Sequence, residues 1–259
     1  MTGWTALVLA GQRPGIDPLA HAFGTEWKAL VDVGGQPMLD RVVRTLLACP
    51  QIDRIVIAAQ APDLFATGWL AADPRIRFTQ SQRGISHSIA AVAGTPAAPW
   101  PVLVTTADHP LLTPDMVAAF LTGASAADVA VGMVERRTML AAYPNTKRTW
   151  LRFRGGAYSG ANLFALRTAK AQAALNLWAQ AEQDRKQALK LFWHFGPLLA
   201  LRAVTRTITG PDALRTAGRR LGLDATLVSL PQAEAAIDVD KLADHALAET
   251  ILKARVQAQ

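Results

Sequence analysis

The sequence has few of the features that mark secreted or membrane proteins. Of its 259 residues only Cys49 is a cysteine, so no intrachain disulfide can form, and a reducing cytoplasm is the expected compartment. The start, Met1–Trp4, lacks the basic residues of a secretory signal, and the apolar run after it is too short for one. Lys190 and His194 interrupt a later apolar stretch. We therefore expect a cytoplasmic protein without a transmembrane segment.

The sequence also lacks a nucleic-acid-binding motif, although its formal net charge is +7. Basic residues occur as scattered pairs such as Arg136–Arg137 and Arg219–Arg220, without a helix-turn-helix, zinc finger or aromatic RNA-binding pattern. A solvated surface explains this charge, as does a basic cleft for small polyanions, and we do not expect nucleic acid as a partner. A hydrophobic content of 51% is ample for the core of one large domain.

A glycine-containing loop follows the first apolar run. Leu7–Ala10 predicts a buried strand, and the loop Gly11–Gly15 leads from it toward Lys28. Glycine lets a backbone pass close to a polyphosphate with its N–H groups exposed, and Arg13 and Lys28 add positive charge. The spacing is neither that of a P-loop nor that of G-x-G-x-x-G, and an ordinary tight turn explains the pattern equally well. An amphipathic helix over 40–47 and a second strand over 54–59 are predicted next.

The order of these segments carries a family resemblance. A strand, Ala10–Gly11, an arginine-containing loop, Lys28–Leu30, Gly35–Leu39 and a helix resemble the nucleotidyltransferases related to molybdenum-cofactor guanylyltransferase, a group that includes sugar-phosphate enzymes. The chain departs from the family by inserting residues 16–26 between loop and lysine, which leaves the position of Arg13 open.

The resemblance implies one α/β domain over residues 1–259, with a helical insertion at about 168–206. Its fold would be the three-layer, Rossmann-like (GT-A-like) nucleotidyltransferase fold with a mixed, mostly parallel sheet. Lys28, expected to be an exposed loop lysine, and Arg13 would be catalytic. The residues expected to bind the nucleotide are Leu9, Ala10, Gly11, Gln12, Gly84 and Ser88.

A magnesium site is predicted from two acidic segments. The apolar strand 102–106 leads to Asp108, and ligands of open α/β sheets gather at the carboxyl ends of strands. Mg²⁺ prefers oxygen ligands and needs only one or two carboxylates beside substrate phosphates. Asp108 resembles the family's D-x-P aspartate, and residues 238–244 resemble its D-x-D-T-P-E-D segment with Thr-Pro-Glu replaced by Lys-Leu-Ala. The resemblance implies Asp108 and Asp240 as ligands, with Asp238 as the alternative to Asp240; capping of turns and helices would explain the same acids.

Two segments resemble elements that bind substrates in this family. Residues 82–88 resemble the G-x-x-x-S segment beside the nucleotide, although an ordinary capped helix also explains them. The segment 159–162 resembles the element that closes over the second substrate. The residues that this assigns to the second substrate are Gly160, Asn162, Arg152 and Arg154. A β-turn at a strand edge is the alternative for this segment.

The predicted function is Mg²⁺-dependent transfer of a nucleotidyl group from an NTP, with CTP or GTP favoured, to a phosphorylated small-molecule acceptor. A glycosyltransferase that uses a nucleotide-sugar is an alternative, as is a noncatalytic nucleotide-binding scaffold whose partner docks on 189–201. The helical region 168–206 also fits a lid, a homodimer contact or a peripheral membrane contact.

Overall fold

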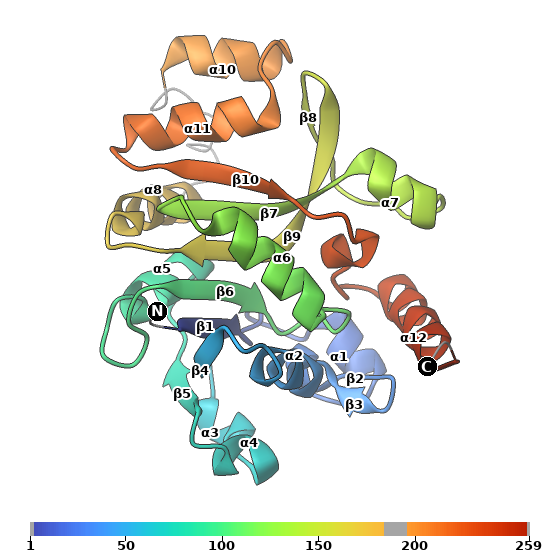
Figure 1. Cartoon of the computed structure of the whole chain (residues 1–259). Coiled ribbons are helices and arrows are strands. Elements are labelled where there is room, and N and C mark those ends of the chain that lie inside the picture. Colours follow the sequence, from blue (N-terminus) through green and yellow to red (C-terminus); the bar gives the residue numbers. More distant parts are fainter. Residues whose placement is uncertain (1–2, 184–195, 258–259) are drawn as a thin grey trace.

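The computed structural model describes residues 3–183 and 196–257 and has the expected α/β fold (Figure 1). Its centre is an eight-stranded mixed sheet in the order β10-β7-β9-β6-β1-β4-β5, with β8 paired to β9. The strands are β1 (Trp4–Leu9), β4 (Ile52–Ala59), β5 (Ile76–Gln80), β6 (Val102–Thr106), β7 (Val129–Glu135), β8 (Leu151–Phe153), β9 (Gly156–Leu166) and β10 (Ala225–Ser229). A small hairpin apart from the sheet consists of β2 (Asp32–Val33) and β3 (Gln36–Pro37).

The sheet is parallel except at β9. Strand β1 pairs in parallel with β4 and β6, β4 with β5, and β7 with β10, whereas β9 is antiparallel to β6, β7 and β8. The expected mixed, mostly parallel sheet is therefore confirmed. The carboxyl ends of β1 and β6 lie at one edge, because Leu9 is in register with Thr106.

Helices cover both faces of the sheet. The α-helices are α1 (Pro18–Ala22), α2 (Met38–Leu47), α3 (Pro62–Phe65), α4 (Gly68–Ala72), α5 (Ile85–Val92), α6 (Pro114–Ala124), α7 (Arg136–Ala142), α8 (Ala171–Gln183), α10 (Pro197–Val204), α11 (Gly210–Arg220) and α12 (Leu242–Gln257). Two short 3₁₀ helices are η1 (Lys28–Leu30) and η2 (Ala233–Ala236).

The alternation of side chains along β1 divides the core in two. Val8 belongs to a cluster with Leu46 of α2 and Phe120 of α6, whereas Leu7 belongs to a second cluster with Ile89 of α5. Successive residues of a strand point to opposite faces of its sheet. The two clusters therefore lie on opposite faces and make the predicted three layers of helix, sheet and helix.

The predicted elements are present with shifted boundaries. The helix expected over 40–47 begins at Met38, directly after Pro37, and the strands expected from Leu7 and from residue 54 begin at Trp4 and Ile52. The region expected to be a helical insertion contains α8 and α10. Residues 184–195, and with them Lys190, His194 and most of the suggested docking segment 189–201, lie outside the described residues.

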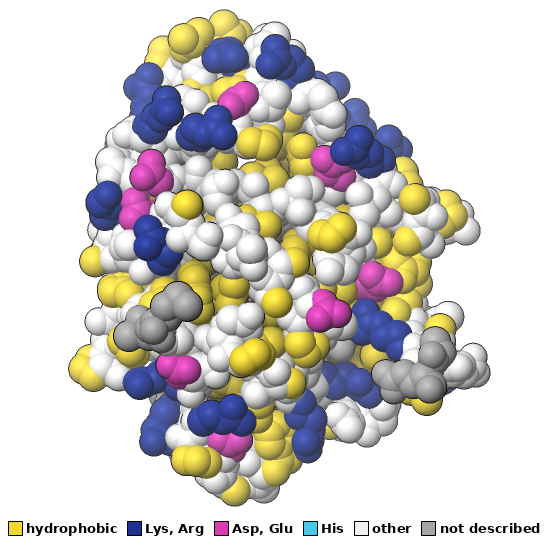
Figure 2. Space-filling model, viewed as in Figure 1, with side chains coloured by type: hydrophobic (Ala, Val, Ile, Leu, Met, Phe, Trp, Pro, Cys, Tyr) yellow, Lys and Arg dark blue, Asp and Glu magenta, His cyan; other side chains and the backbone are white. Residues whose placement is uncertain are grey.

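The molecular surface has mixed charge. On the face shown in Figure 2, Lys and Arg side chains are spread over its whole height, with Asp and Glu between them. Within the described part of the chain, no helix combines the length and apolar character that crossing a bilayer requires.

Candidate active site

One lysine joins the two aspartates that the sequence assigned to a metal. Nζ of Lys28, in η1, lies 2.6 Å from Oδ2 of Asp108 and also bonds to Oδ1 of Asp240. Asp108 follows β6 and Asp240 precedes α12. Three segments that are far apart in the sequence thus meet at the carboxyl ends of β1 and β6, where the topology of an open α/β sheet favours ligand binding.

Backbone hydrogen bonds hold the acidic segments beside the sheet. The amide of Ala107 donates to the carbonyl of Leu9 at 3.0 Å, which continues the pairing of β1 and β6 up to Asp108. The amide of Val239 donates to the carbonyl of Asp108 at 2.9 Å, and the Val239 side chain is fully buried. Burial of Val239 therefore anchors the segment from which Asp240 extends toward Lys28.

Glutamine side chains hold the loop after β1. The amide of Gln12 donates to Oε1 of Gln60 at 3.1 Å, and Nε2 of Gln60 donates back to the Gln12 carbonyl at 2.6 Å. Oε1 of Gln12 accepts the Lys28 amide at 2.9 Å, so the loop and the lysine are fixed to each other. Within the described residues, the amides of Gly11 and Arg13 donate to no partner. Exposed, unpaired N–H groups are what a phosphate-binding loop requires.

The predicted catalytic residues have different environments. The side chain of Lys28 is only 15% exposed, so the expectation of an exposed loop lysine is wrong. Burial opposes its charge, but Asp108 and Asp240 outweigh burial and hold the pKa of the Lys28 ammonium above its ordinary value. Arg13 is exposed and forms no ion pair within the described residues, so its catalytic role stays a prediction.

The carboxylates have free oxygens that suit a hard cation. Oδ1 of Asp108 is buried and has no hydrogen-bond partner within the described residues, and the side chain of Asp240 is 55% exposed. Buried polar atoms without partners are rare and need an explanation, which a bound cation would supply here. Among the described residues no group of three or more His, Cys, Asp or Glu side chains can hold a metal alone. The pair fits Mg²⁺ that takes its remaining ligands from water and substrate phosphates.

Asp238, the alternative metal ligand, is bound by an arginine. Nη1 of Arg148 lies 2.6 Å from Oδ1 of Asp238, and Nη2 lies 3.2 Å from Oδ1 of Asp244. Burial and the nearby carboxylates of Asp240 and Asp108 raise the pKa of Asp238, and Arg148 opposes this rise. This arrangement favours Asp240 over Asp238 as the ligand. Asp244, in the first turn of α12, also accepts the Lys241 amide at 3.1 Å, as the acidic residue of a capping box does.

The segment predicted to lie beside the nucleotide is held by an acidic residue. Gly84 directly precedes α5, and the Ser88 hydroxyl donates to the Gly84 carbonyl at 2.7 Å, so Ser88 shapes this loop. The amides of Ile85 and Ser86 donate to the carboxylate of Glu182, in α8, at 2.9 and 3.0 Å. The carboxylate thus lies where the amides at a helix N-terminus favour an anion. Nucleotide contact by Gly84 and Ser88 stays a prediction.

The residues expected to bind the second substrate lie in β8, in β9 and, for Arg154, in the turn between them. Asn162 is in β9 with a positive φ of 49°, at an irregularity in the pairing of β9 with β7. Because Phe164 pairs with Val104, Asn162 lies toward the carboxyl end of β6. Bulges of this kind often re-aim a side chain beside an active site. Gly160 is exposed, as are Arg152 and Arg154, and substrate contact by all four residues stays a prediction.

Three residues that organise the site were not identified from the sequence, namely Arg148, Glu182 and Gln60. Their partners lie 90, 96 and 48 positions away, so no local spacing connects them. An apolar strand that ends in a polar residue would have drawn attention to Gln60 alone, because it directly follows β4.

Comparison with known proteins gives one family and several similar structures. The model of the MobA-like NTP transferase domain matches residues 6–190. A hypothetical transferase from Thermus thermophilus has a TM-score of 0.77 and 29% identity, over 94% of this chain and 99% of its own. A search of curated proteins found no match.

Two more distant structures share the fold. A 4-diphosphocytidyl-2C-methyl-D-erythritol synthase from Anaerococcus prevotii has a TM-score of 0.60 and 12% identity, over 97% of this chain and 99% of its own. A CMP:2-keto-3-deoxy-manno-octonic acid synthetase, solved with CTP, has a TM-score of 0.61 and 15% identity, over 98% of this chain and all of its own.

Proposed function

The chain belongs to the MobA-like NTP transferase family, and we propose that it joins an NTP to a phosphorylated small-molecule acceptor in a Mg²⁺-dependent reaction. The observation that carries this proposal is the contact of Lys28 with both Asp108 and Asp240 at the carboxyl ends of β1 and β6. A lysine and two carboxylates beside unpaired loop amides suit a metal-bound triphosphate better than a neutral ligand.

In the proposed reaction, an oxygen of the acceptor phosphate attacks the α-phosphorus of the NTP. A new P–O bond forms, the bond between the α-phosphorus and its bridging oxygen to the β-phosphate breaks, and pyrophosphate leaves with that electron pair. Such a displacement depends mainly on positioning and on neutralising the charge of the phosphates. It requires neither a covalent protein intermediate nor an imidazole.

The chain's own residues would divide this work. The Gly11 and Arg13 amides would donate hydrogen bonds to phosphate oxygens, and the Lys28 ammonium would turn from the carboxylates toward the triphosphate. Asp108 and Asp240 would hold Mg²⁺, whose charge would stabilise the negative charge on the phosphates. Asn162, Arg152 of β8 and Arg154, in the turn after β8, would hold the acceptor.

A screen of four NTPs, with CTP and GTP first, against a panel of phosphorylated metabolites would test this function. We expect pyrophosphate to appear only when an NTP and the right acceptor are both present with Mg²⁺. Release of a nucleoside diphosphate from a nucleotide-sugar would instead support the glycosyltransferase. Binding of a nucleotide without turnover across the panel would support the noncatalytic scaffold.

A further inference from the structure

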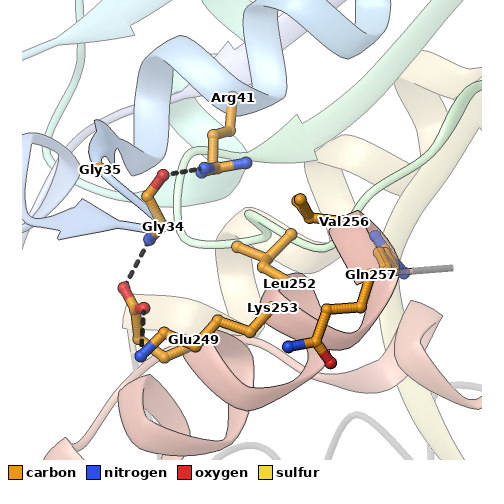
Figure 3. Close-up of a pocket in the computed structure, with 9 residues that line it drawn as sticks. Gly34, Gly35, Arg41, Glu249, Leu252, Lys253, Val256 and Gln257 are labelled. Carbon is orange, nitrogen blue, oxygen red and sulfur yellow. Dashed lines mark hydrogen bonds and ion pairs between the residues drawn. The ribbon is translucent and has the colours of Figure 1, made fainter. Parts of the chain in front are cut away.

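A hollow lies away from the cluster of Lys28, Asp108 and Asp240, between the β2–β3 hairpin and the last turns of α12 (Figure 3). Its volume is about 620 Å³, within the range of small-molecule sites. Figure 3 shows Arg41 reaching toward it from α2, with Leu252 and Val256 on the α12 side. None of these side chains belongs to the group around Lys28, so this hollow is a separate feature of the surface.

The lining of the hollow has an excess of positive charge. Arg41, Lys253 and Arg255 contribute three cations, whereas Glu249 is the single acid among the lining residues. The carboxylate of Glu249 already accepts the Gly34 amide and lies 3.8 Å from Nζ of Lys253. Within the described residues neither arginine lies within ion-pair distance of a carboxylate, although Glu249 attracts Arg41 from farther away, so both guanidinium groups can still pair with an external anion.

Both guanidinium groups are held in place by neutral oxygens. Arg41 donates to the carbonyls of Val33 and Gly34, and Nη1 of Arg255 donates to the carbonyl of Leu111 at 3.1 Å. These contacts use three of the ten N–H donors of the two groups and cancel none of their charge. Burial lowers the pKa of Arg41, the nearby Glu249 carboxylate opposes this shift, and Arg255 adds a smaller repulsion that lowers the pKa further. An anion between them would relieve this repulsion without ordering a flexible side chain.

The remaining walls indicate what else the ligand contains. A side chain at Gly34, where φ is +60°, would lie 2.4 Å from Nη2 of Arg41, so glycine leaves room for the guanidinium there. Leu252 and Val256 provide apolar surface beside the charged groups, and the Val256 side chain is 76% exposed. We propose that this hollow binds a small organic anion, with its phosphate or carboxylate between Arg41 and Arg255 and its apolar part on Leu252 and Val256.

Titration of the isotope-labelled full chain with phenyl phosphate would test this site. The amide resonances of Gly34 and Gly35 should shift and saturate, whereas inorganic phosphate should bind about tenfold or more weakly because it buries no apolar surface. Phenyl phosphate and benzoate would separate phosphate from carboxylate ligands. Phenol, which carries no anion, should leave both resonances in place.

Variants separate this site from the catalytic one. Arg255→Gln should weaken phenyl phosphate about tenfold by removing a charge-assisted hydrogen bond, and Val256→Glu, a change at an exposed position, should weaken it through repulsion. Arg44→Gln is the matched control, because the Arg44 guanidinium lies over the Trp69 ring and outside the hollow. Lys28→Ala should leave the shifts unchanged. Absence of saturable shifts, equal affinity in Arg255→Gln, or loss of the shifts in Lys28→Ala would overturn the proposal.

Discussion

Nζ of Lys28 lies 2.6 Å from Oδ2 of Asp108, although 80 positions separate these residues in the sequence. The same ammonium also bonds to Asp240, so a single positive charge stands between two carboxylates. The lysine expected to meet phosphate and the acids expected to meet metal therefore form one electrostatic unit. Binding of a metal ion must separate the Lys28 ammonium from the two carboxylates, because the ammonium competes with the cation for them.

Lys28→Ala should lower the melting temperature at pH 7 in the absence of Mg²⁺, because Asp108 and Asp240 lose the charge between them. Adding Mg²⁺ should restore more of this loss in the variant than it adds to the wild-type protein, since the cation replaces the ammonium. Thermal unfolding with and without Mg²⁺ measures both effects. If the melting temperature of the variant does not change when Mg²⁺ is added, no cation binds between these carboxylates.

Asp108→Asn and Asp240→Asn should each lower kcat by about 100-fold or more, because each change removes a charged ligand beside the phosphates. The double variant should be little worse than the poorer single one, since residues that act as a unit are not additive. Activity measured as a function of Mg²⁺ concentration tests whether Asp240 or Asp238 is the second ligand. Asp240→Asn should need more Mg²⁺ and Asp238→Asn should not; the reverse order would make Asp238 the ligand.

Arg148→Met should destabilise the fold by about 2–3 kcal/mol, less than for a fully buried pair because the Asp238 side chain keeps 31% exposure. The pKa of Asp238 is already raised, and loss of Arg148 should raise it further. A carboxyl group whose pKa is higher in the folded than in the unfolded protein stabilises the fold at pH values below its unfolded-state pKa. This stabilisation is lost as the pH rises through its folded-state pKa.

The stability deficit of Arg148→Met should consequently shrink as pH falls from 7 toward 4, where Asp238 binds a proton and no longer needs a partner. Urea unfolding at several pH values measures this trend. Lys147→Met, at the exposed neighbouring position, is the matched control and should show neither effect. A deficit that stays constant with pH would mean that Arg148 acts through packing alone.

The sequence predicted the mixed, mostly parallel sheet, several of its elements and three residues that the structure brings together. Lys28, Asp108 and Asp240 could be found because each adjoins a local pattern, namely a loop, a strand end and a helix start. The pairing of Arg148 with Asp238 and that of Glu182 with Ser86 could not, because they depend on how distant elements pack. Burial of Lys28 was missed for the same reason: two acids far along the chain surround a lysine that local sequence presents as exposed.

Asn162→Gly should keep the fold, because glycine adopts a positive φ more easily than asparagine, and stability should change by less than about 1 kcal/mol. If its amide binds the acceptor, KM for the acceptor should rise about tenfold with little change in KM for the NTP. Steady-state kinetics with each substrate varied in turn measures KM for the acceptor and KM for the NTP separately. Asn145→Gly, in an exposed turn, serves as the control, and an unchanged KM for the acceptor would remove Asn162 from its site.

The most direct test of the account is simultaneous measurement of pyrophosphate and nucleotide-linked product from one reaction with Mg²⁺, an NTP and the acceptor found by screening. The account predicts equal amounts of the two products from the wild-type chain. It also predicts that the rate falls by at least about 100-fold in a Lys28→Ala variant that remains folded. Product formation without pyrophosphate, or an unchanged rate in folded Lys28→Ala, would contradict nucleotidyl transfer at the cluster of Lys28, Asp108 and Asp240.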